Sequence, residues 1–375
     1  MKLTNDSQIL LDFIKNCKIN NERFSNKSQN FLKNILRTIY KKYNSYKPIV
    51  YHEDADEIIP SDSGKYIKNQ KKSYYSTVDL KNRKYKIIFY FENEQTKKKL
   101  DVYFFKVYLI LQVLNNYSTN TEISHNVVLQ IFMSEHKKYL PKNKIPLDEE
   151  HVNSAYTRTC TQTTEICIFR KEEWFKVLIH ELFHNMGLDF ACMNHTDTDK
   201  IMFNLIKLKK NDIRLYESYT ECWANILNTV FLAFFDTKIK TNYDLMLTKI
   251  EKMTHNEICF ALFQLKKVLN HYNLKYSEIY KANNNYKENT YVISYYMIKV
   301  IFLYNKNKFI EWNHSHNSYI QFTQSEENII ELCKFIYNLY NQSSFIEDIE
   351  DFSKKTSNNQ LINTSMRMTL YEMEN

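Results

Sequence analysis

Apolar residues recur at helical spacing over most of the chain. Two N-terminal segments, about 7–17 and 27–45, show this pattern, and in the second Phe31, Ile35 and Ile39 share one side. A third helix is predicted over about 97–116. From Glu172 onward the pattern is almost continuously helical, and it predicts helices over about 171–186, 198–209, 213–235, 241–252, 255–271, 289–304 and 325–342.

Four shorter segments favour strands, because they are rich in the β-branched and aromatic residues that suit a pleated surface. They are Tyr75–Leu80, Tyr85–Glu92, Asn126–Met133 and Thr163–Arg170. Residues 46–73 are polar and irregular, with a turn signal at Asp62-Ser63-Gly64. The last twenty or so residues are polar and weakly periodic, which predicts a loosely held tail.

This order of elements predicts a mainly helical α+β fold. A small mixed sheet is expected in an N-terminal lobe, a helical lobe follows, and a cleft is expected between them. The expected divisions are N-terminal helices with an irregular connection over 1–72, a sheet-containing lobe over 73–170, a helical lobe over 171–345 and a tail over 346–375. With only 2 glycines and 4 prolines in 375 residues, the composition also favours long helices over many tight turns.

Composition says more about the cellular location and the partners of the protein than about its chemistry. The net charge of +8 comes from scattered lysines and predicts no nucleic-acid site. No apolar run is long enough to span a membrane, and the first residues lack a signal-peptide core. The 7 cysteines are odd in number and form no CxxC, so no disulfide framework is expected and a reducing compartment fits better. We therefore expect an intracellular, soluble protein that is not secreted, and the sequence leaves its oligomeric state open.

The most informative stretch is WFKVLIHELFHNMG, which begins at Trp174 and ends at Gly187. His180 and His184 lie one helical turn apart on the same face, so both imidazoles can bind one ion, and two such nitrogens suit Zn²⁺. Glu181 lies about 100° further round the helix, where a general base can reach a metal-activated water. Gly187 follows at the place where a helix end favours positive φ. The alternative is an amphipathic helix with a solvated polar stripe.

A catalytic zinc needs a third protein ligand. Phe190 occupies the position where a third histidine would extend the motif, and Asp189 is one residue early and reads as a turn or cap residue. A later apolar helix supplies Glu221 and, four residues before it, Glu217. We expect Glu221 to bind the metal because it lies deeper in the apolar run, with Glu217 as the alternative. Asn225 is a candidate to accept the free N–H of a ligating imidazole.

The pair HELFH and Glu-x-x-Ala resembles the glutamate-ligand zincins, the thermolysin-like side of the metallopeptidases. The longer strings IFRKEEWFKVLIHELFHNMGLDF and YESYTECWANILN resemble an uncharacterised metallopeptidase family of large cytoplasmic DNA viruses. The first resemblance covers about a tenth of the chain, and the second extends further but carries little established function. Together they imply one zinc ion, attack by water on a peptide or protein substrate, and a location in the host cytoplasm or the virion. Asn225 departs from the pattern, because the thermolysin-like family usually has an acidic residue there.

Other candidates are weaker. The resemblance implies that a strand beside the cleft pairs with extended substrate. Thr163–Arg170 is the candidate strand, and a purely structural edge strand is the alternative. A donor for the developing oxyanion could be Tyr296, Tyr295 or His195. The Glu311–His316 segment reads as a polar loop with incidental histidines rather than a second metal site, and Cys192-x-x-His195 is only a pair of ligands. The competing functions are a zinc-binding but non-proteolytic structural or virion-associated protein, and a metal-free helical interaction protein.

Overall fold

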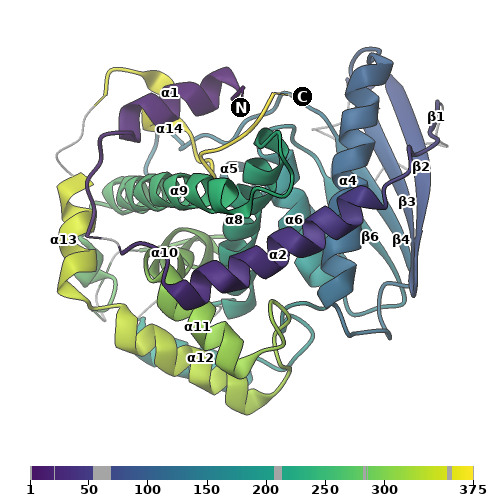
Figure 1. Cartoon of the computed structure of the whole chain (residues 1–375). Coiled ribbons are helices and arrows are strands. Elements are labelled where there is room, and N and C mark those ends of the chain that lie inside the picture. Colours follow the sequence, from purple (N-terminus) through teal and green to yellow (C-terminus); the bar gives the residue numbers. More distant parts are fainter. Residues whose placement is uncertain are drawn as a thin grey trace.

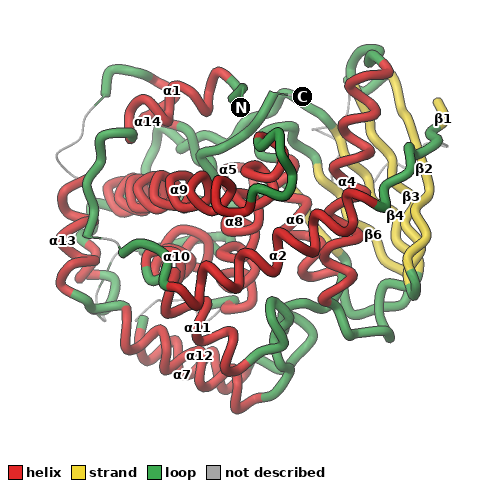
Figure 2. The backbone as a smooth tube through the Cα atoms, viewed as in Figure 1, coloured by secondary structure: helices red, strands yellow, loops and turns green. Residues whose placement is uncertain are grey.

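The computed structural model describes residues 2–20, 22–53, 69–206, 213–281, 284, 286–352 and 357–374. These residues form an α+β fold with one mixed sheet and a large helical part, as the sequence predicted. Figure 1 and Figure 2 show the sheet at one side of the molecule and the helices filling the other. Among the described residues, no helix combines the length and apolar character needed to cross a membrane.

The N-terminal half contains the whole sheet. Its elements in chain order are α1 (Asn5–Ile14), α2 (Asn26–Asn44), β1 (His52–Glu53), β2 (Lys72–Leu80), β3 (Arg83–Phe91), α4 (Lys97–Tyr117), β4 (Asn126–Phe132), α5 (Glu149–Val152), β5 (Ala155–Thr157) and β6 (Thr163–Ile168). All four predicted strands are present, with ends that differ by a few residues. The short strands β1 and β5 were not predicted, because two or three residues show no periodicity. The predicted turn at Asp62-Ser63-Gly64 lies outside the described residues.

The C-terminal half is helical. Its elements are α6 (Trp174–Asn185), α7 (Thr196–Leu205), α8 (Leu215–Asp236), α9 (Tyr243–His271), the 3-10 helix η2 (Tyr276–Glu278), the π-helical turn η3 (Ser294–Ile298), α10 (Lys299–Tyr304), α11 (Lys306–His316), α12 (Glu326–Leu339), α13 (Ser343–Asp351) and α14 (Gln360–Thr364). The two helices predicted over 241–252 and 255–271 form the single helix α9. The predicted polar loop over 311–316 is instead the end of α11, and the predicted end of helix 198–209 extends beyond the described residues.

The sheet has the strand order β1-β2-β3-β4-β6-β5. Strands β3, β4 and β6 are parallel, whereas β5 runs antiparallel to β6 and forms one edge. The expectation that Thr163–Arg170 would be the strand beside the cleft is therefore wrong, because β6 lies between β4 and β5. Among the described residues, β5 is the edge strand on that side.

Helices cover one face of the sheet. Side chains alternate along β3, so Ile87 and Phe89 join the large helical core, whereas Ile88 and Tyr90 point to the other face. There they pack in a small separate cluster that also contains Phe132, Cys167 and Phe169. The large core extends through the helical part without interruption, so α6 and α8 are surrounded by apolar side chains.

The end of α6 is shaped by Gly187, which has φ +64°. The N–H of Gly187 donates to the His184 carbonyl at 3.2 Å, and the N–H of Leu188 donates to the Phe183 carbonyl at 2.9 Å. These two bonds form a Schellman cap, which reverses the chain just after the motif. A Cβ at Gly187 would also lie 3.0 Å from Asn120, so both the backbone and the space favour glycine. This confirms the sequence prediction for this residue.

The C-terminal segment 365–371 is buried, contrary to the prediction of a loosely held tail. Its backbone N–H groups donate to two buried carboxylates: Met368 donates to Glu173 at 2.7 Å, and Leu370 donates to Glu257 at 3.0 Å. Polar side chains elsewhere in the chain thus satisfy this backbone, which a search for periodicity cannot detect.

Candidate metal centre

Helices α6 and α8 face each other through a row of ionisable side chains. Lys176, His180 and His184 lie one turn apart along α6, and Glu221 and Glu217 lie one turn apart along α8. Lys176 at the start of the first row contacts Glu221, and His184 at its end contacts Glu217, so the two helices are antiparallel here. All five side chains are buried. Buried ionisable groups are stable only when each has a partner, so these contacts decide the chemistry of the site.

His180, His184 and Glu217 form a compact triangle of ligand atoms. The Nε2 atoms of the two histidines lie 3.0 Å apart, and Glu217 Oε2 lies 3.1 Å from Nε2 of His180 and 3.3 Å from Nε2 of His184. Ligands about 2.0–2.1 Å from a tetrahedral zinc ion would be roughly 3.3 Å from one another. The three atoms therefore fit one face of a tetrahedral site. Among the described residues, this is the only group of three or more His, Cys, Asp or Glu side chains that could hold a metal ion.

The other ring nitrogen of each histidine has a carboxylate partner. Nδ1 of His180 donates to Glu221 Oε2 at 2.9 Å, and Nδ1 of His184 donates to Asp189 Oδ2. Asp189 also accepts hydrogen bonds from the Ala191 backbone at 3.2 Å and from Thr220 Oγ1 at 3.1 Å. Carboxylates in these positions fix the ring orientation, so that Nε2 of each histidine faces the triangle.

The geometry therefore favours Glu217, the alternative, over Glu221, the residue preferred from the sequence, as the candidate third ligand. Both oxygens of Glu221 are occupied away from the triangle, one by His180 and the other by the Lys176 ammonium. The expected role of Asn225 is also wrong. Its side chain donates to the Met368 carbonyl at 3.3 Å, and the imidazole N–H groups go to Glu221 and Asp189 instead.

The electrostatics agree with this division of roles. Burial opposes ionisation of Glu217, but the nearby imidazoles of His184 and His180 hold the pKa of its carboxyl well below the usual range. Burial likewise opposes ionisation of Glu221, but Lys176 and His180 lower its pKa to about 2. Both carboxylates are therefore ionised at neutral pH, so Glu217 is available to a cation and Glu221 accepts from His180.

Glu181 lies beside the triangle and contributes no atom to it. Thr157 Oγ1, on the edge strand β5, donates to Glu181 Oε2 at 2.5 Å and holds the side chain between α6 and the sheet edge. Burial raises the pKa of the Glu181 carboxyl above its usual value. A carboxylate that is buried, oriented and easier to protonate than usual has the properties of a general base. The contact with Thr157 could not be predicted from the sequence, because the strand that carries Thr157, β5, was itself not predicted.

Tyr295, rather than Tyr296, faces the site. The Tyr295 hydroxyl donates to Glu217 Oε2 at 3.1 Å, whereas the Tyr296 hydroxyl donates to the Met366 carbonyl at 2.5 Å and points away. Of the two tyrosine candidates for an oxyanion donor, Tyr296 is therefore ruled out, and Tyr295 stays a candidate. Both tyrosines lie in the π-helical turn η3, a rare conformation that is frequent at functional sites. His195 contacts the Ala191 carbonyl at 3.4 Å and lies outside the ligand triangle.

Cys160 and Cys192 form a disulfide across a separation of 32 residues. It links the loop after β5 to the loop after α6, and neighbouring Thr159 donates to the His184 carbonyl at 3.0 Å. The sequence did not predict this pair, and a disulfide does not fit the expectation of a reducing compartment. The disulfide also removes Cys192 as a metal ligand partner for His195.

Comparison of the chain with protein-family models, curated proteins and solved structures finds no match. The assignment of a candidate metal centre therefore rests on the geometry of its residues.

Proposed function

We propose that this chain is a zinc-dependent metallopeptidase of the glutamate-ligand zincin type. The observation that carries the proposal is the buried triangle of His180, His184 and Glu217 with Glu181 beside it. Two imidazoles and one carboxylate are a ligand set found in catalytic zinc sites, where a fourth position stays open. Helix α6 supplies both histidines and Glu181, so one helix would provide two metal ligands and the group that transfers a proton.

Bound zinc would activate water and polarise a substrate carbonyl. Glu181 is placed to accept the proton from that water and then to deliver it to the leaving amine. Thr157 keeps the Glu181 carboxylate turned toward the site. Tyr295 is neutral, since burial raises the pKa of its hydroxyl well above the usual value. Its single O–H, which donates to Glu217, would turn from that carboxylate to charge developing on the carbonyl oxygen.

The edge strand β5 is the candidate for substrate binding. It lies at the end of the sheet formed by the described residues, and Thr157 connects it directly to Glu181. An edge strand can pair with an extended peptide through main-chain hydrogen bonds. This replaces the earlier assignment of that role to Thr163–Arg170.

The proposal predicts one zinc ion per chain and chelator-sensitive cleavage of peptides. Purified protein should contain close to one equivalent of zinc by mass spectrometry of the metal. Treatment with a chelator should abolish cleavage of a mixed peptide library, and added Zn²⁺ should restore it. Protein that contains no metal and cleaves no peptide after zinc addition would refute the proposal.

A second prediction concerns Tyr295. Tyr295→Phe should lower kcat about 10²–10³-fold, the usual effect of losing one oxyanion donor, with zinc content unchanged. Tyr296→Phe is the matched control, because the adjacent hydroxyl binds the Met366 carbonyl outside the site. It should leave kcat within about threefold. Equal activity in the two variants would remove Tyr295 from the mechanism.

A zinc-binding but non-proteolytic protein is the second candidate. It is favoured by the enclosure of the site, since His180, Glu181 and His184 are each only 7% exposed. Stoichiometric zinc without cleavage of any peptide in the library would support this alternative.

A further inference from the structure

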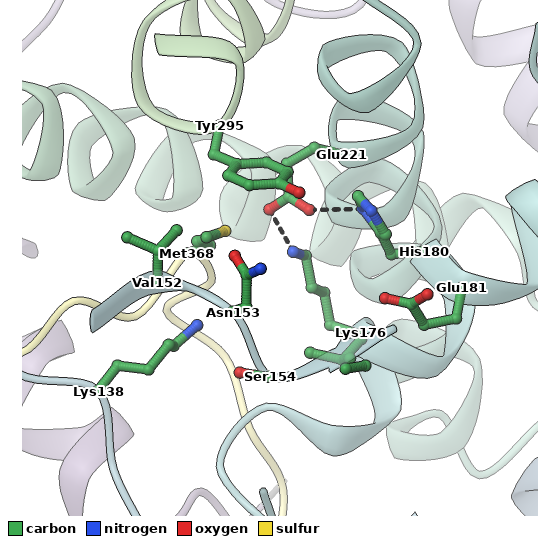
Figure 3. Close-up of a pocket in the computed structure, with 12 residues that line it drawn as sticks. Lys138, Val152, Asn153, Ser154, Lys176, His180, Glu181, Glu221, Tyr295 and Met368 are labelled. Atoms are coloured by element: carbon green, nitrogen blue, oxygen red, sulfur yellow. Dashed lines mark hydrogen bonds and ion pairs between the residues drawn. The ribbon is translucent and has the colours of Figure 1, made fainter. Parts of the chain in front are cut away.

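A small cavity adjoins His180 and Glu181 below Tyr295 (Figure 3). Its walls are formed by the start of β5, the first half of α6 and the C-terminal segment. The lining residues used below are Lys138, Asn153, Ser154, Lys176, Glu221 and Tyr295. The cavity volume is about 40 Å³, which is room for about three water molecules at 10–15 Å³ each. A group of a few atoms can enter it, whereas a large aromatic side chain cannot.

The cavity is rich in hydrogen-bond donors. Lys176 pairs with Glu221, and Lys138 pairs with Glu173 at 2.6 Å. The side chains of these lysines are only 4% and 2% exposed. An ammonium group has three N–H bonds, so one carboxylate partner leaves donors on each lysine without an acceptor. Figure 3 shows both amino groups and the Asn153 amide turned toward the same region.

Ser154 adds a further donor. It is 6% exposed, it lines the cavity, and its hydroxyl has no hydrogen-bond partner. A buried hydroxyl without a partner is unfavourable, so Ser154 would gain from an acceptor that enters the cavity.

The two carboxylates that line the cavity, Glu181 and Glu221, already accept hydrogen bonds, and Thr157 donates to one oxygen of Glu181. The two oxygens of Glu221 accept from Lys176 and His180. The Tyr295 O–H is not one of the available donors, because it donates to Glu217. Glu221 and Glu173 offset the charges of the two lysines, so the cavity has an excess of donors rather than a large net charge. A ligand with several acceptor lone pairs and little bulk would satisfy this excess, and a carboxylate has both properties.

We infer that this cavity binds a carboxylate group of the substrate, close to the bond that is cleaved. The inference rests on the proposed function and narrows it to a substrate class. Two sources share this chemistry: the side chain of an acidic residue beside the cleaved bond, and the C-terminal carboxylate of a short peptide. Lys138, Lys176 and Ser154 would be the residues that determine this specificity.

Peptides that differ at one position test the inference. Sets with Asp, Asn or Leu on either side of the cleaved bond should show kcat/KM at least tenfold higher for Asp than for Asn, as expected for a hydrogen bond to a charged group. A second set compares free and amidated C-termini. A preference for free C-termini alone would identify the C-terminal carboxylate as the source. Cleavage with no preference in either set would overturn the inference.

Variants connect the preference to the cavity. Lys138→Met and Ser154→Ala should each reduce the preference for a carboxylate about tenfold. Lys171→Met is the control, because that ammonium forms an ion pair with Glu135 and its side chain is 47% exposed. Ser154→Ala removes a single hydroxyl and keeps the inference testable if Lys138→Met fails to fold. An unchanged preference in Ser154→Ala and in folded Lys138→Met would refute the assignment of the cavity.

Binding of succinate separates this inference from the proposed function. Isothermal titration calorimetry on metal-free protein should show succinate binding that is about tenfold weaker in Ser154→Ala, with succinamide as the uncharged control. If no peptide is cleaved but succinate binds in this manner, the peptidase proposal fails and the carboxylate site stands. If peptides are cleaved and succinate and succinamide bind equally, the carboxylate site fails alone.

Discussion

Glu217→Gln should weaken zinc binding far more than Glu221→Gln does, although the two residues lie one turn apart on the same helix. Structural zinc sites bind with about 10–16 kcal/mol, so each of four ligands contributes about 3 kcal/mol, or more than a hundredfold in affinity. Glu217 supplies an oxygen within 3.3 Å of both Nε2 atoms. Glu221 contacts no atom of the triangle and binds His180 through the far nitrogen, Nδ1, and loss of such a partner typically costs about 10–100-fold in metal affinity.

Zinc affinity of both variants should be measured by competition with a chromogenic chelator, with metal content as a check. Glu221→Gln also leaves the buried Lys176 ammonium without its charged partner, which can destabilise the fold by about 3–5 kcal/mol. The double variant Lys176→Met/Glu221→Gln removes both charges and is the control for this effect. Greater zinc loss in the Glu221 variants than in Glu217→Gln would return the ligand role to Glu221.

The sequence predicted the part of the centre that is local. His180, Glu181 and His184 lie within one helix, and helical geometry alone determines that the two imidazoles share a face. Gly187 could be assigned in the same way, because a helix end restricts φ. Nothing beyond the helix itself is needed for these predictions.

The identity of the third ligand depends on how α6 and α8 are aligned with each other. This alignment is set by contacts between segments that are distant in the sequence. Glu217 and Glu221 share one face of α8, so periodicity cannot distinguish them. The contact of Lys176 with Glu221 fixes the alignment, because it leaves Glu217 opposite the two histidines. Lys176 lies one turn before His180 in an apolar helix, and this unusual position was the available signal. Depth in the apolar run was the wrong criterion for choosing the third ligand, because the ion pair with Lys176 is enough to explain why Glu221 is buried.

Long-range contacts account for the other differences. Strand β5 is too short to show periodicity, yet it supplies Thr157 to the site. The C-terminal segment has no helical or strand pattern in its sequence. Its backbone N–H groups bind the carboxylates of Glu173 and Glu257, so it needs no regular secondary structure to be buried. The Cys160–Cys192 pair depends on two loops that meet only in the folded chain. In each case a polar or covalent contact between distant segments replaces the repeating pattern on which prediction from sequence depends.

Glu181→Gln should abolish most peptide cleavage while zinc remains bound. Glutamine has nearly the same shape and can still accept the hydrogen bond from Thr157, but it cannot accept and transfer a proton. Loss of a general base typically lowers kcat about 10²–10⁴-fold. Zinc content should stay near that of the wild type, since Glu181 is not part of the ligand triangle.

Thr157→Val is the companion variant, because it removes the hydroxyl that orients Glu181 and leaves the carboxylate in place. It should lower kcat by a smaller factor, about tenfold, which corresponds to one hydrogen bond. The expected order of activity is wild type, then Thr157→Val, then Glu181→Gln, at equal zinc content. Near wild-type cleavage by Glu181→Gln would show that another group accepts the proton. Glu217 and Glu221 are already committed to the metal triangle and to Lys176, so the assignment of the metal centre would then also need revision.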